Sequence, residues 1–463
     1  MTRTGRASRC GRRRYGAIAV VLFLAASHEA GAAGFALFEQ SARGLGSAFA
    51  GEAAAAEDAS TIYYNPAGMT LLKGTQFASS GFAIIPTTHF HNEGSSLNPA
   101  VGGGLLTGGN GGNAGDLGLI QTFFISQAIG SRFRIGLGAS TPFGLSTNYE
   151  RGWVGRYHAL NSRLETVNVN PSVAVRLTDW LSIGGGADVE YAHARLTNAL
   201  DLGSICEIFG AQRGLPASVC PALGLAPQSV DGWVKVSGDN WNAGYNLGAL
   251  VSPLPGLRLG VAYRSTIHHD LVGHADFQIP QKAAILQKIS GALVNTGAHA
   301  AVDLPERVGL SAFQEINPRW ALLTDITWTR WSLFEHIVFQ FDNPKQPAIV
   351  QPEDWKDSFR YSIGVRWRPA RTVQVRAGWA YDETPVRNQT LRTARVPDSD
   401  RVWLAGGVGW QPMDRVDLYL GYAHIFVLNA PIQNADPVSG DIQRGDYSAY
   451  ADVVGVQATL ALF

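Results

Sequence analysis

The sequence predicts an all-β membrane protein: an antiparallel transmembrane β-barrel of about fourteen strands, with an N-terminal hatch, or plug, inside its lumen. Three features of the chain lead to this prediction. Long segments alternate strictly between apolar and polar residues, residues 1–32 have the form of an export signal, and the segment behind that signal is rich in Ala and Gly without alternation. A large secreted β-protein is the alternative that composition alone leaves open.

Residues 1–32 have the form of a signal peptide. Six arginines precede a short apolar run from Tyr15 to Ala26, and Ala30-Gly31-Ala32 supplies the small residues that a signal peptidase recognises. The run is too short for a spanning helix, and a retained signal anchor is the alternative. Of the 37 basic and 37 acidic residues, six arginines and one glutamate lie in this leader, which leaves 31 against 36. The mature chain is therefore mildly acidic, and no basic patch suggests a nucleic acid partner.

Residues 33–74 lack the alternation of a strand and are rich in Ala, Gly and Ser. The stretch 47–57 predicts a short helix of small residues. Asn65 is placed to cap a second helix, with Pro66 in its first turn and Gly74 beyond its end. Small residues allow compact segments to pack closely, and a barrel this wide has to be filled or form a pore. We therefore expect this segment to plug the lumen.

Residues 75–463 are predicted to form the barrel. In the segment 359–367, five large apolar side chains alternate with arginine, serine or glycine, so one face suits hydrocarbon and the other carries guanidinium groups. An arginine that faces the bilayer midplane costs roughly 2–4 kcal/mol, which assigns the arginine face to the lumen. The pattern recurs in the segments 132–138, 167–176, 257–264 and 373–382. The C-terminal Phe463 fits the terminal aromatic signal that barrel assembly machinery recognises.

Short turns alternate with long polar connections in this part of the chain. Gly130-Ser131 and Asn317-Pro318-Arg319 are examples of the short turns. The long connections are predicted at 145–162, 199–231, 274–300, 341–353, 383–398 and 431–446. Short periplasmic turns and long extracellular loops are typical of outer-membrane barrels. Cys206 and Cys220 are predicted to form a disulfide in the second loop, because the periplasm is oxidising.

The segment behind the leader carries a specific series of short motifs. They are Gly34-Phe35, Leu37, Glu39, Ser41, Gly44-Leu45-Gly46, Ala48, Gly51-Glu52, Asp58-Ala59 and Asn65-Pro66-Ala67-Gly68-Met69. This series resembles the N-terminus of the FadL/TodX family, outer-membrane transporters of long-chain fatty acids and other hydrophobic molecules. A second similar motif is Thr141-Pro142-Phe143-Gly144-Leu145. The resemblance implies a barrel of about fourteen strands with an N-terminal hatch, located in the outer membrane.

The resemblance also implies a release route for a hydrophobic ligand. The mature N-terminus would reach into the ligand pocket and free the ligand by moving, and a lateral opening would lie at the third strand. In that strand Pro142 cannot donate to the ladder and Gly144 permits a kink. Simpler alternatives are that Phe35 only packs the plug and that Pro142 lies past the strand's end in a loop. The residues expected to bind substrate or gate its passage are Phe35, Leu37, Asn65, Pro66, Ala67, Pro142, Phe143, Gly144 and Leu145.

Ligand entry is expected at the extracellular loops. In the loop 274–300, apolar residues follow helical spacing, and the loop that carries the cysteines adds further apolar side chains. An apolar groove between the two loops would collect ligand, and the resemblance implies a low-affinity site there. The groove residues are Phe209, Ile285, Leu286, Ile289 and Leu293. An ordinary loop core explains the same residues equally well.

Arg264 and Arg360 are the candidates for binding a ligand carboxylate. The direction of their strands places both near the middle of the lumen, where a fatty acid head group would meet them. Inward-facing acidic residues give these arginines an alternative role in a structural charge network. An arginine that contacts ligand favours a fatty acid substrate, and a wholly apolar pocket favours a monoaromatic compound such as toluene.

Two other classes of function remain as alternatives. An outer-membrane enzyme would need a nucleophile with a basic partner, and the histidines His268, His269 and His274 have no such motif beside them. A hydrophilic porin or an adhesin would leave the plug unexplained. No metal-ligand spacing or phosphate-binding glycine loop is found, so no cofactor is expected. The expected partners are a long-chain fatty acid or other hydrophobic molecule, outer-membrane lipid and lipopolysaccharide, and the chain is expected to be a monomer.

Overall fold

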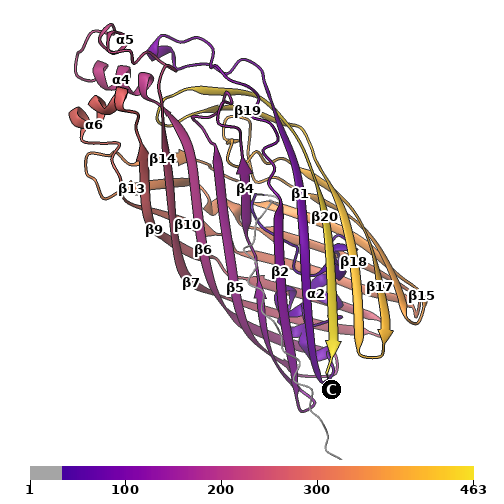
Figure 1. Cartoon of the computed structure of the whole chain (residues 1–463). Helices are drawn as coiled ribbons and strands as arrows, with labels where there is room; N and C mark the ends of the chain where they lie inside the picture. Colours follow the sequence, from indigo (N-terminus) through magenta and orange to yellow (C-terminus); the bar gives the residue numbers. More distant parts are fainter. Residues whose placement is uncertain (1–33, 463) are drawn as a thin grey trace, which may run out of the picture.

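The structure is a computed structural model that describes residues 34–462. The expected signal peptide (1–32) and the terminal Phe463 lie outside the described residues. The strands form one antiparallel sheet that closes on itself, because the last strand, β20 (Ile442–Ala461), pairs with the first, β1 (Thr75–Asn92). Figure 1 shows the strands slanting across the molecule as a tilted cylinder.

The closed wall has fourteen transmembrane strands, as the alternation pattern predicts. Eight are single segments: β1, β20, β2 (Gly118–Ile129), β5 (Asn161–Arg176), β6 (Leu181–Asp201), β7 (Asp231–Leu254), β16 (Val373–Asp382) and β17 (Arg401–Met413). The others are built from two consecutive segments each: β3 (Phe133–Ser140) with β4 (Gly144–Asn148), β8 (Leu257–Arg264) with β9 (Ile267–Gln278), β10 (Thr296–Leu304) with β11 (Arg307–Asn317), β12 (Trp320–Thr329) with β13 (His336–Phe341), β14 (Ile349–Pro352) with β15 (Ser358–Ala370), and β18 (Val416–Val427) with β19 (Ala430–Ala435).

The two faces of the wall have the chemistry that the sequence predicts. On β15, Ile363 is 47% exposed and Phe359 38%, whereas Arg360 and Arg366 are each only 2% exposed. The outward apolar side chains form a continuous apolar surface of the kind that a bilayer covers. Among residues 34–462, no helix is both long and apolar enough to cross a membrane.

The two ends of the barrel differ as expected. Short turns join the strands at one end, and the longer loops at the other end carry the helices α4 (Leu202–Ala211), α5 (Val219–Ala222) and α6 (Ala284–Ser290) with the 3-10 turns η2 (Pro99–Val101) and η3 (Gln281–Ala283), whereas the 3-10 turn η4 (Trp331–Leu333) lies between β12 and β13. In Figure 1 these helices lie at the upper end and the C-terminus at the lower end. Four predicted loops are shorter than expected, because strands continue the pairing of the wall within them: β4 within 145–162, β9 and β10 within 274–300, β14 within 341–353, and β19 within 431–446.

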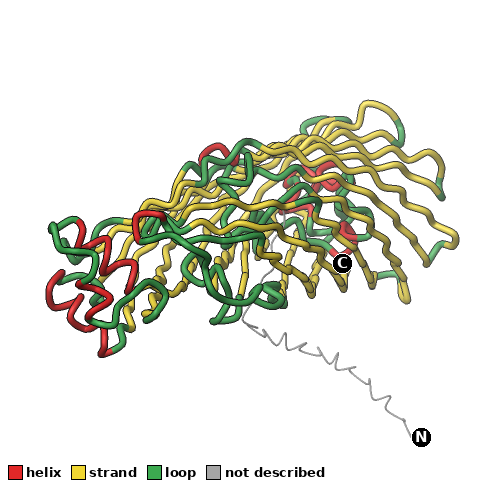
Figure 2. The backbone as a smooth tube through the Cα atoms, turned by 90° about the horizontal axis from the view of Figure 1, so that it is seen from above, coloured by secondary structure: helices red, strands yellow, loops and turns green. Residues whose placement is uncertain are grey.

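Residues 34–74 lie inside the barrel. They form α1 (Ala42–Leu45), α2 (Glu52–Ala55), α3 (Thr61–Tyr64) and η1 (Pro66–Leu71), which appear as helices surrounded by strands in Figures 1 and 2. The single helix predicted over 47–57 is wrong. Ala48 and Phe49 have φ angles of 48° and 55°, so the backbone turns left-handed there and helix α2 begins only at Glu52. Asn65 caps η1 as predicted, because its side chain accepts a hydrogen bond from the amide of Ala67.

Glycines on the inner face of the wall allow the backbone of residues 34–74 to touch the strands. A Cβ atom built on Gly260 would lie 2.0 Å from the carbonyl oxygen of Ala53, and one on Gly378 would lie 2.2 Å from the carbonyl carbon of Ser47. No larger residue fits at these positions, because the atoms opposite are backbone and cannot rotate away. The inward glycines of the alternating pattern are therefore contact points for the inner segment.

Gly378→Ala should loosen the inner segment while leaving the barrel closed. The added methyl group overpacks the contact with Ser47, at a cost of about 1–3 kcal/mol, whereas strand pairing of β16 is unaffected. We expect a severalfold rise in ion conductance across planar bilayers. Gly406→Ala on the neighbouring strand is the matched control, because the nearest atom to its Cβ lies 3.9 Å away. Equal conductance in both variants would contradict this interpretation.

Candidate functional site

The third transmembrane strand is interrupted, and the N-terminal segment pairs with the interruption. The strand breaks between Ser140, the end of β3, and Gly144, the start of β4. The amide of Leu37 donates to the carbonyl of Pro142 at 2.8 Å, and the amide of Gly144 donates to the carbonyl of Phe35 at 2.8 Å. Pro142 thus lies inside a short break within the strand. The N-terminal segment supplies the backbone partners that the wall itself lacks there.

Phe35 is seated in a cluster of aromatic rings. Its ring centroid lies 4.7 Å from that of Trp331, 5.5 Å from Phe334 and 5.7 Å from Trp355, and the side chain is 2% exposed. The preceding Gly34 has a φ angle of 60°, and a Cβ atom there would lie within 3 Å of both tryptophans. Several edge-on and tilted ring contacts therefore hold the start of the described chain in one place.

A large apolar cavity, here called the inner cavity, lies against Phe35. Its empty volume is about 800 Å³. The apolar lining comprises Phe35, Leu145, Leu164, Ala194, Leu196, Val236, Leu271, Ala298, Ala300, Val302, Phe334, Ile337, Phe339 and Val396. The N-terminal segment, the resumed third strand and the strands opposite thus meet around one space that suits hydrocarbon.

A second cavity, here called the loop cavity, continues from the inner cavity toward the long loops. It has an empty volume of about 830 Å³ and reaches Ile205 of α4 and Leu293 beyond α6. Five residues line both cavities: Leu196, Val236, Ile337, Phe339 and Arg395. The two cavities therefore share walls and form one route, the apolar channel, from the helical loops to Phe35.

Arg395 brings a positive charge to the junction of the two cavities. It lies in the loop between β16 and β17 and donates to Ser162 Oγ at 3.3 Å and to Asn198 Oδ1 at 3.2 Å. Among residues 34–462, no carboxylate lies within 4.0 Å of its guanidinium group. Burial lowers the pKa of Arg395 to about 10, so it stays charged at neutral pH.

Glu353 also lines the inner cavity. Trp355 donates its ring N–H to Glu353 at 3.0 Å.

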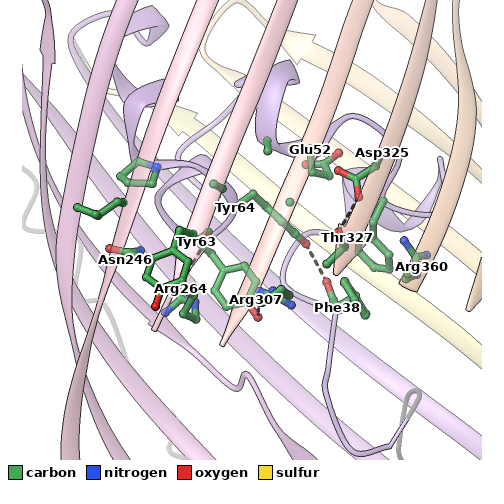
Figure 3. A pocket seen from close by; sticks show the side chains of 17 residues that line it. Phe38, Glu52, Tyr63, Tyr64, Asn246, Arg264, Arg307, Asp325, Thr327 and Arg360 are labelled. Atoms are coloured by element: carbon green, nitrogen blue, oxygen red, sulfur yellow. Dashed lines mark hydrogen bonds between the residues drawn. The ribbon is translucent and has the colours of Figure 1, made fainter. Parts of the chain in front are cut away.

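The predicted arginines Arg264 and Arg360 line a different cavity, which is polar and lies beside the inner segment (Figure 3). Arg264 forms an ion pair with Asp188 and stacks on the ring of Tyr63 at 4.6 Å. Arg360 donates to the carbonyl of Ala48 at 2.9 Å. Neither arginine lines the apolar channel. The ion pair of Arg264 with Asp188 fits the alternative interpretation, in which this arginine belongs to a structural charge network.

The motif Asn65-Pro66-Ala67 anchors the inner segment to the wall. The side-chain amide of Asn65 donates to the carbonyls of Ala249 on β7 at 2.9 Å and of Ala53 at 2.7 Å. A Cβ atom built on Gly248 would lie 2.0 Å from Oδ1 of Asn65. Leu37 is fully buried in the packing between this segment and the wall, whereas Phe143 joins the aromatic rings around Phe35.

The loop residues of the predicted groove divide into two groups. Cys206 and Cys220 form the predicted disulfide, and Leu286 and Leu293 pack with them in one apolar cluster. In contrast, Ile285 and Ile289 are 39% and 59% exposed, and Phe209 packs beneath the guanidinium group of Arg213 at 3.3 Å. The two loops do pack together, as expected, and Leu293 is the member of the set that lines the loop cavity.

Comparisons with known proteins agree with this architecture. Over residues 23–462 the chain matches the family described as outer membrane protein transport protein (OMPP1/FadL/TodX). The long-chain fatty acid transport protein of Escherichia coli O6:H1 is 27% identical over 425 residues, which cover 88% of this chain and 90% of that protein. A Pseudomonas aeruginosa FadL homologue of known structure is 24% identical with a TM-score of 0.84, over 93% of this chain and 100% of its own. The P. putida toluene transporter TodX is 16% identical with a TM-score of 0.63, over 86% and 93%.

Gly34→Ala should detach the N-terminal segment from the interrupted strand. The methyl group would meet Trp331 and Trp355, so the amides of Leu37 and Gly144 should exchange with deuterium at least tenfold faster, which is about 1.4 kcal/mol. Gly130→Ala is the matched control, since Gly130 has a similar φ of 63° with no atom within 4 Å of its Cβ. Unchanged deuterium exchange in Gly34→Ala would show that the aromatic rings around Phe35 do not hold this segment.

Proposed function

Because the chain belongs to the OMPP1/FadL/TodX family of outer membrane transport proteins, we propose that it carries long-chain fatty acids through the apolar channel. Its location is the outer membrane and its activity is transport. One observation carries the choice of substrate. Most of the channel lining is apolar, and among the described residues Arg395 is the charged side chain that lines both of its cavities, whereas Arg163 and Glu353 line only the inner cavity and Asp436 only the loop cavity.

The apolar walls account for ligand capture. Burying one methylene group is worth about 0.8 kcal/mol, so a sixteen-carbon chain gains on the order of 10 kcal/mol in a fitted pocket. The carboxylate of a fatty acid needs a hydrogen-bonded partner when it leaves water, and Arg395 offers guanidinium N–H groups with no carboxylate already bound. A chain bound this tightly leaves only when part of the pocket moves.

The N-terminal segment is the part whose movement solves the release problem. Phe35 lines the inner cavity, and the same segment fills the break in the third strand through Leu37 and Gly144. Displacing it therefore removes one wall of the cavity and unpairs the break in a single step. Ligand enters through the loop cavity, is held beside Arg395 and leaves sideways between β3 and β4 toward the membrane.

Uptake of a toluene-like compound is the second candidate. The apolar lining of the inner cavity supports it, because a ring without charge needs no polar partner there. Such a compound would occupy a small fraction of the route and would leave Arg395 without a function. A fatty acid therefore needs the positive charge of Arg395, whereas a toluene-like compound does not.

Arg395→Gln should weaken oleate binding about tenfold or more, because a hydrogen-bonded charge contributes about 1.5–3 kcal/mol. Binding of the corresponding long-chain alcohol, and uptake of toluene, should stay close to wild type. Isothermal titration and radiolabel uptake measure these quantities. Arg360→Gln is the control for the alternative head-group site. If Arg360→Gln weakens oleate binding and Arg395→Gln does not, Arg395 is not the head-group ligand.

A reversible cross-link tests lateral release. Ala36 and Phe143 form a non-hydrogen-bonded antiparallel pair, whose Cα atoms lie about 4.5 Å apart, a spacing that a disulfide tolerates. In the double variant Ala36→Cys with Phe143→Cys, oxidation should abolish oleate uptake while cells still bind oleate at the surface. Reduction should restore uptake. The two single variants, treated alike, control for the native Cys206–Cys220 bond. Full uptake by the oxidised double variant would exclude movement of this segment.

A further inference from the structure

A wide polar cavity, here called the turn-end vestibule, lies at the end of the barrel opposite the loops. Its empty volume is about 1780 Å³, and it opens among the turns that join β11 to β12 and β15 to β16. Its charged lining comprises Arg43, Arg258, Arg319, Arg366, Arg368 and Arg371 with the acidic residues Glu57, Glu315 and Asp417. Arginine thus exceeds carboxylate, and the vestibule attracts anions.

One carboxylate of the inner segment is shared among several of these arginines. Glu57 lies 2.7 Å from Arg366 Nη1 and 3.8 Å from Arg368 Nη2, and it is also paired with Arg376. These contacts tie the inner segment to β15 and β16. Glu57 is therefore the charged attachment of that segment on the vestibule side.

The arginines have binding capacity that the protein does not use. Arg366 is 2% exposed, and its Nε and Nη2 atoms have no hydrogen-bond partner among the described residues, with Glu315 at 3.9 Å from Nη2. Arg258, Arg319 and Arg371 have no salt-bridge partner in the part of the chain that the structure describes. A buried donor without a partner is unfavourable, and an anion with several oxygens would satisfy it.

Two of the guanidinium groups also pack against the same aromatic ring. Arg258 lies 4.1 Å and Arg366 5.0 Å from the centroid of Phe313. The two positive charges therefore lie within about 9 Å of each other, and a bound anion would reduce their repulsion. The arrangement is what a binding site for phosphate or carboxylate groups requires.

We propose that the turn-end vestibule binds a small polyanion with phosphate or carboxylate groups from the periplasm. The polyanion competes with Glu57 for Arg366 and Arg368 and thereby loosens the attachment of the inner segment. This site shares no lining residue with the apolar channel, so the proposal stands whichever compound the protein transports.

Titration of the full-length protein with pyrophosphate tests the proposal. The protein is kept in an alkyl maltoside, which carries no anionic group, and chloride maintains constant ionic strength. We expect one saturable binding event per chain. The double variant Arg319→Gln with Arg371→Gln should bind at least about tenfold more weakly. Arg132→Gln, an exposed arginine in the turn between β2 and β3, should bind like wild type.

A variant of Glu57 tests the proposed competition directly. Glu57→Gln removes the internal competitor, so pyrophosphate should bind more tightly than to wild type. Hydrogen exchange of wild-type protein is an independent measurement, in which pyrophosphate should speed exchange over residues 46–58 and chloride should not. Binding of citrate in place of pyrophosphate would assign the site to carboxylates. Failure of both anions to bind, equal weakening in Arg132→Gln, or exchange that does not respond to either anion would overturn the proposal.

Discussion

The constraint on which this architecture depends is that a backbone amide or carbonyl within lipid must find a partner inside the protein. Closure of the wall by β20 against β1 meets that constraint over most of the barrel. The third strand is broken at Pro142 inside the wall, and there Phe35 and Leu37 supply the missing partners. The hydrogen bonds that hold the N-terminal segment are thus the same ones that complete the wall at the break. If the segment moves, the break loses its partners.

The contact between inner segment and wall follows from a second constraint, the space available inside the barrel. Because strands bring inward glycines such as Gly260 and Gly378 against backbone atoms, the segment lies directly on the wall at these points, without side chains in between. Contacts of this kind resist compression but give little apolar burial. Two polar contacts fix the position of the segment on the wall. The side-chain amide of Asn65 donates to the wall on one side, and the carboxylate of Glu57 pairs with arginine on another. These polar attachments add to the apolar packing of Leu37 and Ile62 of the segment against the wall.

Local sequence rules predicted the wall well, because successive residues of a strand face alternately the lipid and the lumen. Arg360 and Ile363 face opposite sides for that reason alone, and the cap of Asn65 follows from the residues beside it. The channel was not predictable in this way. Its lining comes from strands, turns and the loop of Arg395, which are distant in sequence, and its inward residues are apolar although the alternation predicts polar ones. The break at Ala48 was missed because a non-glycine residue with positive φ leaves no signal in composition.

The two ends of the lumen follow opposite chemistry, and the inner segment separates them. On the loop side most of the lining is apolar, whereas on the turn side arginines gather around Glu57. A ligand held by apolar burial gains nothing from entering a cationic, hydrated vestibule, because it would lose the burial energy that captured it. The favourable direction from the inner cavity is therefore sideways into lipid, where the hydrocarbon stays out of water throughout. In the route proposed above the broken third strand supplies this exit, and the vestibule is free to control the segment that closes the break.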